Sequence, residues 1–123
     1  MADIKEVPGA GTYQHIAELI GTMELSGPET VGDIMDQLTE MPLSVSVRSG
    51  WQHPGVNDQS PEEYELLLGT GGPAVRVYGR LDEHARPRSA ELQGQNWFTP
   101  WERTTVDQDE EVLLQFAGYF YYD

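Results

Sequence analysis

Cysteine is absent from this sequence of 123 residues. Its absence excludes disulfides, thiolate nucleophiles and cysteine-ligated zinc or iron–sulfur sites. Long hydrophobic runs are absent too, since none approaches the roughly 18 residues that a membrane-spanning helix needs. Residues 1–11 lack the basic-then-apolar order of a secretory signal. We therefore expect a cytoplasmic protein that does not interact with membranes.

Basic residues are scarce and unevenly placed. Seven Lys and Arg accompany 21 Asp and Glu, which gives a formal net charge of −14. Direct binding to nucleic acid depends on Lys and Arg that neutralise phosphates, so this composition argues against it. From Glu6 to Val47 there are seven carboxylates and no base, and from Thr104 to Asp123 five more, again without a base. Because surfaces normally mix both signs, this concentration predicts a basic partner.

Composition and length predict one folded domain over residues 1–123, in which the Pro- and Gly-rich residues 1–11 are flexible. Hydrophobic periodicity predicts a first helix with its N-cap at Thr12, ending at about Thr22. A capping box of Ser26 and Glu29 then opens a second helix that ends at about Thr39.

Alternating polar and apolar residues predict strands in the middle of the chain. The four expected strands are Ser44–Arg48, Tyr64–Leu68, Ala74–Leu81 and Ala90–Trp97. Connections this short favour an antiparallel meander. The predicted fold class is therefore α+β: an about four-stranded antiparallel meander sheet with two N-terminal helices and one C-terminal helix covering one face.

The second helix carries the main candidate site. Four carboxylates recur at spacings of 4, 3 and 4 residues, which places them on a single stripe: Glu29, Asp33, Asp36 and Glu40. Neighbours along the stripe lie roughly 5–6 Å apart and the row spans about 16 Å, the same scale as the charges along one nucleic-acid strand. The alternative is the solvated face of an amphipathic helix.

A second acidic cluster, Asp107 with Asp109, Glu110 and Glu111, has an ordinary explanation. Asp107 and Glu110 form a capping box that opens the last helix, where carboxylates stabilise the helix dipole. This helix is expected to bury apolar residues of its own: Leu113, Leu114, Ala117 and Phe120. The cluster either starts that helix or adds to the same negative surface.

The aromatic segment Trp97–Trp101 and the C-terminal segment Tyr119–Tyr122 each allow two interpretations. Both segments most simply pack in the core, where Trp97–Trp101 would fasten the last helix to the sheet. Alternatively, Trp101 is a hot spot for a protein partner. The glycines of Gly69–Pro73 fit positive-φ positions in a hairpin turn better than a phosphate loop, which would need a following Lys and helix.

Catalytic motifs are absent, and we do not expect an enzyme. A metal-dependent hydrolase assembled around His53 with Asp58, Glu62 and Glu63 has suitable ligand types, but no recognised ligand spacing. No serine lies in a nucleophile elbow. We accordingly expect no cofactor.

The stretch YELLLGTGGPAVRVYGRLD, followed by QNWFTPWE, resembles a pattern in small uncharacterised proteins of phages and bacterial mobile elements, over residues 63–102. The acidic helices resemble, in character, phage-borne anti-restriction and anti-CRISPR proteins, several of which present carboxylate arrays to the nucleic-acid grooves of defence enzymes. The resemblance implies inhibition by occlusion, in the cytoplasm of a bacterial host, of a defence nuclease or its effector complex.

Two functional hypotheses follow. In the first, the protein is a non-enzymatic inhibitor whose second-helix stripe occupies the Lys and Arg sites of a basic nucleic-acid-binding protein. Carboxylates outside the stripe support it: Glu18, Glu24 and the cluster containing Asp109 and Glu110. In the second, the protein is an acidic adaptor that binds a partner through its sheet or Trp101, and the charge serves solubility.

Overall fold

The chain folds into three helices and five strands in the computed structural model, which describes residues 8–56, 60–70, 73–96, 99–104 and 107–123. In chain order the elements are α1 (Ala10–Glu24), α2 (Pro28–Glu40), β1 (Ser44–Ser49), β2 (Pro61–Gly69), β3 (Ala74–Arg80), β4 (Glu91–Gln95), β5 (Glu102–Arg103) and α3 (Glu110–Ala117). The predicted α+β class, with two N-terminal helices and one C-terminal helix, is confirmed.

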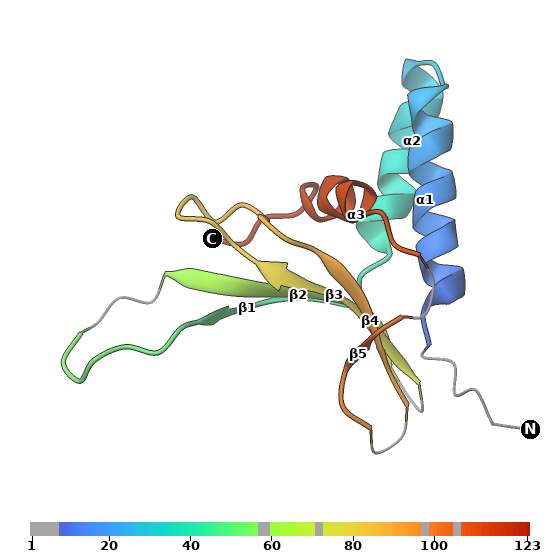
Figure 1. The fold of residues 1–123 in the computed structure, drawn as a ribbon. Coiled ribbons are helices and arrows are strands. Elements are labelled where there is room, and N and C mark those ends of the chain that lie inside the picture. The colour runs from blue at the N-terminus through green and yellow to red at the C-terminus, as the bar shows by residue number, and fades with distance from the viewer. Residues whose placement is uncertain (1–7, 57–59, 71–72, 97–98, 105–106) are drawn as a thin grey trace, which may run out of the picture.

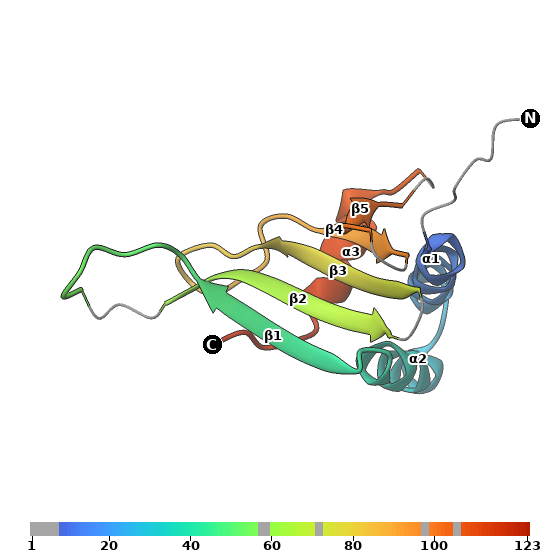
Figure 2. The ribbon, with the colours of Figure 1, turned by 90° about the horizontal axis from the view of Figure 1, so that it is seen from below.

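The sheet is an antiparallel meander with the strand order β1-β2-β3-β4-β5, so β1 and β5 form its edges (Figure 2). The prediction of a meander is confirmed, and the strand that it missed is β5, which has only two residues. A strand this short carries no readable alternation and forms because Gln93 and Gly94 of β4 offer it a pairing edge.

The core lies between the sheet and the helices. α1 and α2 lie side by side and project from one end of the sheet, whereas α3 lies across one sheet face (Figure 1). The buried side chains come from all three helices and from the central strands: Ile16, Ile20, Ile34, Leu38, Tyr64, Leu66, Val77, Leu92, Leu113, Phe116 and Ala117. Period-2 alternation leaves the other sheet face to polar side chains.

Close packing at one point of the core requires a glycine. A Cβ on Gly79 would collide with the carbonyl oxygen of Ser89 and approach the ring of Tyr64 to 2.8 Å. The Tyr64 hydroxyl donates a hydrogen bond to the same Ser89 oxygen at 2.7 Å. Tyr64 also packs on Tyr122, with the ring centroids 4.8 Å apart. The predicted packing of the C-terminal aromatics is confirmed for Tyr122, while Tyr121 stays exposed.

The two N-terminal helices begin at residues other than the predicted caps. α1 starts at Ala10 after the N-cap Gly9, so Thr12 lies inside the helix. α2 has Gly27 as its N-cap without a side-chain cap, so the predicted capping box is wrong. The Ser26 hydroxyl instead donates to the carbonyl of Thr22 at 2.6 Å, in the last turn of α1, and this carbonyl also accepts from the N–H of Leu25.

The start of α3 is also shifted by two residues from the prediction. Asp109, not Asp107, is its N-cap, and its carboxylate accepts a hydrogen bond from the N–H of Glu111 at 3.0 Å. Among the residues expected in the core of this helix, Leu114 and Phe120 are only partly buried, and Phe116 takes a fully buried place instead. Phe116 and Phe120 make an edge contact at 5.4 Å between centroids.

The middle strands are the predicted ones, but they begin or end at other residues than predicted. β2 begins at Pro61, three residues before the predicted start at Tyr64. All residues of β1 except Ser49 are exposed, because this strand forms an edge of the sheet. Gly69 belongs to β2 and has no positive φ. The turn glycines Gly71 and Gly72 lie outside the described residues.

Candidate functional site

The predicted carboxylate row lies on the exposed face of α2. Glu29, Asp33, Asp36 and Glu40 are all exposed. Ile34 and Leu38 are buried on the opposite side of the same helix. The sequence folds this way because the apolar positions recur at helical spacing and Pro28 fits the first turn, where its missing N–H has no cost.

These carboxylates have no compensating cation nearby in the described part of the chain. The ion pairs found there lie elsewhere: Arg48 with Glu63, Arg76 with Glu65, and His84 with Glu83. The last turn of α2 has no basic residue. Like charges at this spacing cost a few tenths of a kcal/mol each, so the row gives α2 no stability of its own.

The other predicted acidic residues divide into two groups. Glu18 and Glu24 are exposed on α1, so they belong to the same projecting hairpin as the α2 row. Asp109 and Glu110 lie at the start of α3. Asp109 caps that helix, and the carboxylate of Glu110 accepts a hydrogen bond from the N–H of Ala90 at 3.3 Å. Helix capping therefore accounts for Asp109, and a hydrogen bond to the residue before β4 accounts for Glu110.

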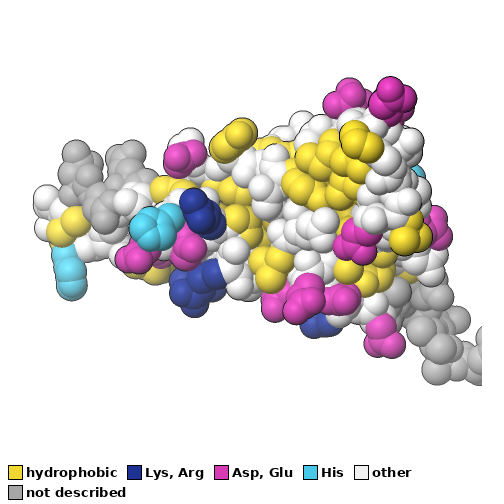
Figure 3. All heavy atoms as spheres, turned by 90° about the horizontal axis from the view of Figure 1, so that it is seen from above, with side chains coloured by type: hydrophobic (Ala, Val, Ile, Leu, Met, Phe, Trp, Pro, Cys, Tyr) yellow, Lys and Arg dark blue, Asp and Glu magenta, His cyan; other side chains and the backbone are white. Residues whose placement is uncertain are grey.

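Charge is distributed unequally along the molecule. Figure 3, which views the helix side of the sheet, shows acidic side chains at several places around the helical end. On this face, Arg and His side chains gather mainly toward the opposite end, where acidic side chains lie among them. The projecting hairpin is therefore a negative surface that the arginines do not neutralise.

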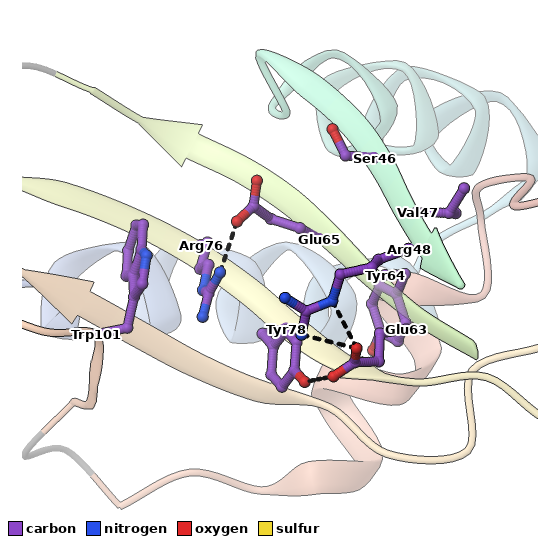
Figure 4. A pocket seen from close by; sticks show the side chains of 9 residues that line it. All are labelled: Ser46, Val47, Arg48, Glu63, Tyr64, Glu65, Arg76, Tyr78 and Trp101. Atoms are coloured by element: carbon purple, nitrogen blue, oxygen red, sulfur yellow. Dashed lines mark hydrogen bonds and ion pairs between the residues drawn. The ribbon is translucent and has the colours of Figure 1, made fainter. Parts of the chain in front are cut away.

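The open face of the sheet carries a polar network that the sequence did not predict (Figure 4). At its centre, Arg76 Nη1 donates to Glu65 Oε2 at 2.7 Å and Arg76 Nε to Gln93 Oε1 at 2.8 Å. The guanidinium carbon lies 4.7 Å from the Tyr78 ring centroid and 4.3 Å from that of Trp101. Two hydrogen bonds to different side chains and two cation–π contacts therefore position this guanidinium.

A second part of the network joins three neighbouring strands. Arg48 of β1 donates to Glu63 of β2 at 2.7 Å, and the hydroxyl of Tyr78 on β3 donates to the other Glu63 oxygen. The Tyr78 hydrogen bond, with Arg48 beside it, lowers the pKa of Glu63. The same hydrogen bond raises the pKa of Tyr78. The carboxylate is thus held ionised by groups from both neighbouring strands.

Trp101 lies on this open face and not against the last helix. Its ring stacks on Arg76, which alternates along β3 with the buried Val77 and so points away from α3. The prediction that this residue fastens the last helix to the sheet is therefore wrong. Trp97 and Phe98 lie outside the described residues. A shallow hollow of about 450 Å³ lies beside Trp101, Arg76 and Arg48.

The hydrolase interpretation depends on His53 and the acidic residues near it in the sequence. His53 is exposed in the connection between β1 and β2, and Asp58 lies outside the described residues. Glu63, one of the proposed ligands, is engaged by Arg48 and Tyr78. Within the described ranges, no group of three or more His, Asp or Glu residues is arranged to hold a metal ion.

The alternation of residues along a strand is enough to predict which side chains share the open face of the sheet. It placed Arg76 and Tyr78 on one side of their strand, as observed. Which carboxylate each would meet depends on the register, which places Glu65 opposite Tyr78 and Glu63 opposite Arg80. Both contacts run diagonally in this register, from Arg76 to Glu65 and from Tyr78 to Glu63. A one-residue slip would have exchanged every such neighbour.

Comparison with known proteins finds no family model, no curated protein and no solved structure that matches this chain. Among the helices that the structure describes, none has both the length and the apolar character needed to cross a membrane.

Proposed function

We propose that this protein is a non-enzymatic inhibitor that binds a basic nucleic-acid-binding protein through the acidic hairpin of α1 and α2. The observation that carries the proposal is the α2 row: Glu29, Asp33, Asp36 and Glu40 are exposed on one side of α2, without an ion pair among the described residues. The mutual repulsion of the row costs stability, and a basic partner would relieve it.

Inhibition would occur by competition for Lys and Arg side chains. Carboxylates accept bidentate hydrogen bonds from arginine as phosphates do. The α2 row spans about 16 Å at the helical rise per residue, so it can meet several phosphate-binding side chains at once. A charged surface of this kind speeds association and makes it sensitive to salt.

The proposed partner class is a bacterial defence nuclease or its effector complex. The support is the resemblance of the acidic helices, in character, to anti-restriction and anti-CRISPR proteins. Such enzymes hold nucleic acid in positively charged channels. A phage or mobile-element protein acting inside the host would block such a channel by occlusion.

The test replaces three carboxylates of the row. The variant Asp33→Asn/Asp36→Asn/Glu40→Gln is compared with wild type for inhibition of DNA cleavage by a panel of purified restriction endonucleases and CRISPR effector complexes. We expect an inhibitory constant at least tenfold weaker, because each lost charge pair contributes on the order of 0.5–1 kcal/mol. The salt dependence of inhibition should also become shallower.

The control removes the same amount of charge from other elements. Glu83→Gln/Glu102→Gln/Asp123→Asn acts at three exposed residues away from the hairpin. This variant should inhibit almost as well as wild type. Equal losses of inhibition in both variants would show that inhibition depends on the net charge of the protein and not on the α2 row. Unchanged inhibition in the first variant would refute charge mimicry.

The second candidate function is a protein adaptor that uses the open face of the sheet. The observation that favours it is Trp101, which lies at the edge of a hollow of about 450 Å³ instead of in the core. Trp101→Ala is expected to abolish partner capture from a bacterial lysate in this case, with the carboxylate variant unaffected. The matched control is Trp51→Ala, a fully exposed tryptophan in a loop.

A further inference from the structure

The edge strand β1 and the chain segments that flank it hold most of the large hydrophobic side chains left exposed in the described ranges. Val45 and Val47 lie on β1, Leu43 directly precedes it, and Trp51 and Val56 lie in the connection that follows it. Val45 and Val47 are 42% and 49% exposed and belong to the strand itself. An edge strand with apolar side chains and free backbone groups is a template for pairing with another strand.

Charge makes this edge unlike the rest of the protein. The seventeen residues between Glu40 and Asp58 contain no Asp or Glu, and their only formal charge is Arg48. The guanidinium of Arg48 is already held by Glu63. A basic partner therefore finds no carboxylate on β1 itself, and the β1 strand of a second copy brings no carboxylate of its own to the contact.

The register shows which backbone groups of β1 point outward. The N–H of Leu81 donates to the carbonyl of Glu62 at 2.8 Å, so Glu62 points toward β3 and the adjacent Glu63 points toward β1. Arg48 pairs with Glu63 and Ser46 with Glu65, so both direct their backbone groups toward β2. By alternation, Val45 and Val47 direct their N–H and C=O groups away from the sheet.

We propose that two copies of this chain associate by antiparallel pairing of β1 with β1, about a two-fold axis that passes beside Ser46. Val45 then lies opposite Val47 of the second copy, and the two valine pairs exchange four backbone hydrogen bonds. The pairing is isologous and closes at two chains. It joins the two sheets into one continuous sheet through the β1 edge, which lies at one side of the sheet in Figure 2.

The side chains of β1 fit this register on both faces. On the helix side, Val45 and Val47 cover each other's apolar surface across the seam. On the open face, Ser44 lies opposite Arg48 of the second copy, so the two arginines do not face each other. Ser46 meets its own counterpart as a non-hydrogen-bonded pair, for which the Cα separation is about 4.5 Å.

A single cysteine tests the register directly, because the chain has none of its own. In Ser46→Cys the two thiols lie beside the axis, within the Cα range of about 4.4–6.8 Å that a disulfide needs. Mild oxidation should convert most of this variant to a covalent dimer that dithiothreitol reverses. The control Ser44→Cys, also exposed on β1, is four residues from its counterpart in this register and should stay largely monomeric.

The mass in solution tests the association itself. Wild type at high micromolar concentration should give about twice 13.8 kDa by light scattering, and Val45→Lys/Val47→Lys should give the monomer mass with an unchanged circular dichroism spectrum. The control Leu25→Lys/Thr30→Lys adds the same charge at exposed residues near the turn between α1 and α2 and should remain dimeric. A monomeric wild type, a dimeric valine variant, or equal cross-linking of both cysteine variants overturns the proposal.

Discussion

Single residues on the open sheet face contribute to the stability of the fold although they lie outside the hydrophobic core. Glu63 lies near the start of β2 and accepts hydrogen bonds from Arg48 on one side and Tyr78 on the other. Its side chain is only 16% exposed. Removing one partner of such a group leaves the others unsatisfied, which costs about 1–3 kcal/mol.

Glu63 should make stability depend on pH in the acid range. Its pKa is lowered in the folded protein, first by the Tyr78 hydrogen bond and then by Arg48. The stability it contributes is therefore present above its unfolded pKa of roughly 4.3 and is lost as the pH falls through the folded pKa.

The variant Glu63→Gln tests this dependence. We expect a loss of about 1–2 kcal/mol at neutral pH, and a smaller further loss than wild type on going to about pH 3. Urea denaturation at a series of pH values measures both. Glu102→Gln on β5 is the control, because that carboxylate is exposed and makes no ion pair in the described ranges. Parallel pH curves for wild type and Glu63→Gln would contradict the prediction.

At the scale of elements, periodicity predicted the core faces well and the helix ends poorly. Ile34 and Leu38 lie four residues apart in α2, at the spacing of one helix face, and both are buried. Ser26, Asp107 and Thr12 were expected to cap helices, and none does. A capping residue competes with neighbours one or two positions away, and the backbone path into the helix selects among them.

The N-cap of α3 gives a direct comparison between two neighbouring aspartates. Asp109→Ala removes the side-chain acceptor for the N–H of Glu111 and should cost about 1 kcal/mol of stability. Asp107→Ala, two residues earlier and also exposed, should change stability by less than about 0.5 kcal/mol. Thermal or urea denaturation of the two variants measures the difference. A larger loss for Asp107→Ala would restore the cap assignment made from the sequence.

At the scale of the whole molecule, two surfaces differ in their content of carboxylates, and they lie on different elements. The hairpin of α1 and α2 carries unneutralised carboxylates, and the edge at β1 carries none. The two proposed associations therefore respond oppositely to salt. Added salt screens attraction between the hairpin and a basic partner and weakens that complex. It also screens repulsion between two chains of net charge −14 and strengthens β1 pairing.

The amino-acid sequence by itself determined the fold class, the meander and the carboxylate row on α2. These depend on local periodicity, which the chain carries along its length. Only the tertiary structure decided that Trp101 stacks on Arg76, that Glu63 joins Arg48 to Tyr78, and that β1 is an exposed edge. Those contacts join residues distant in the chain, and strand register and the placement of α3 bring them together.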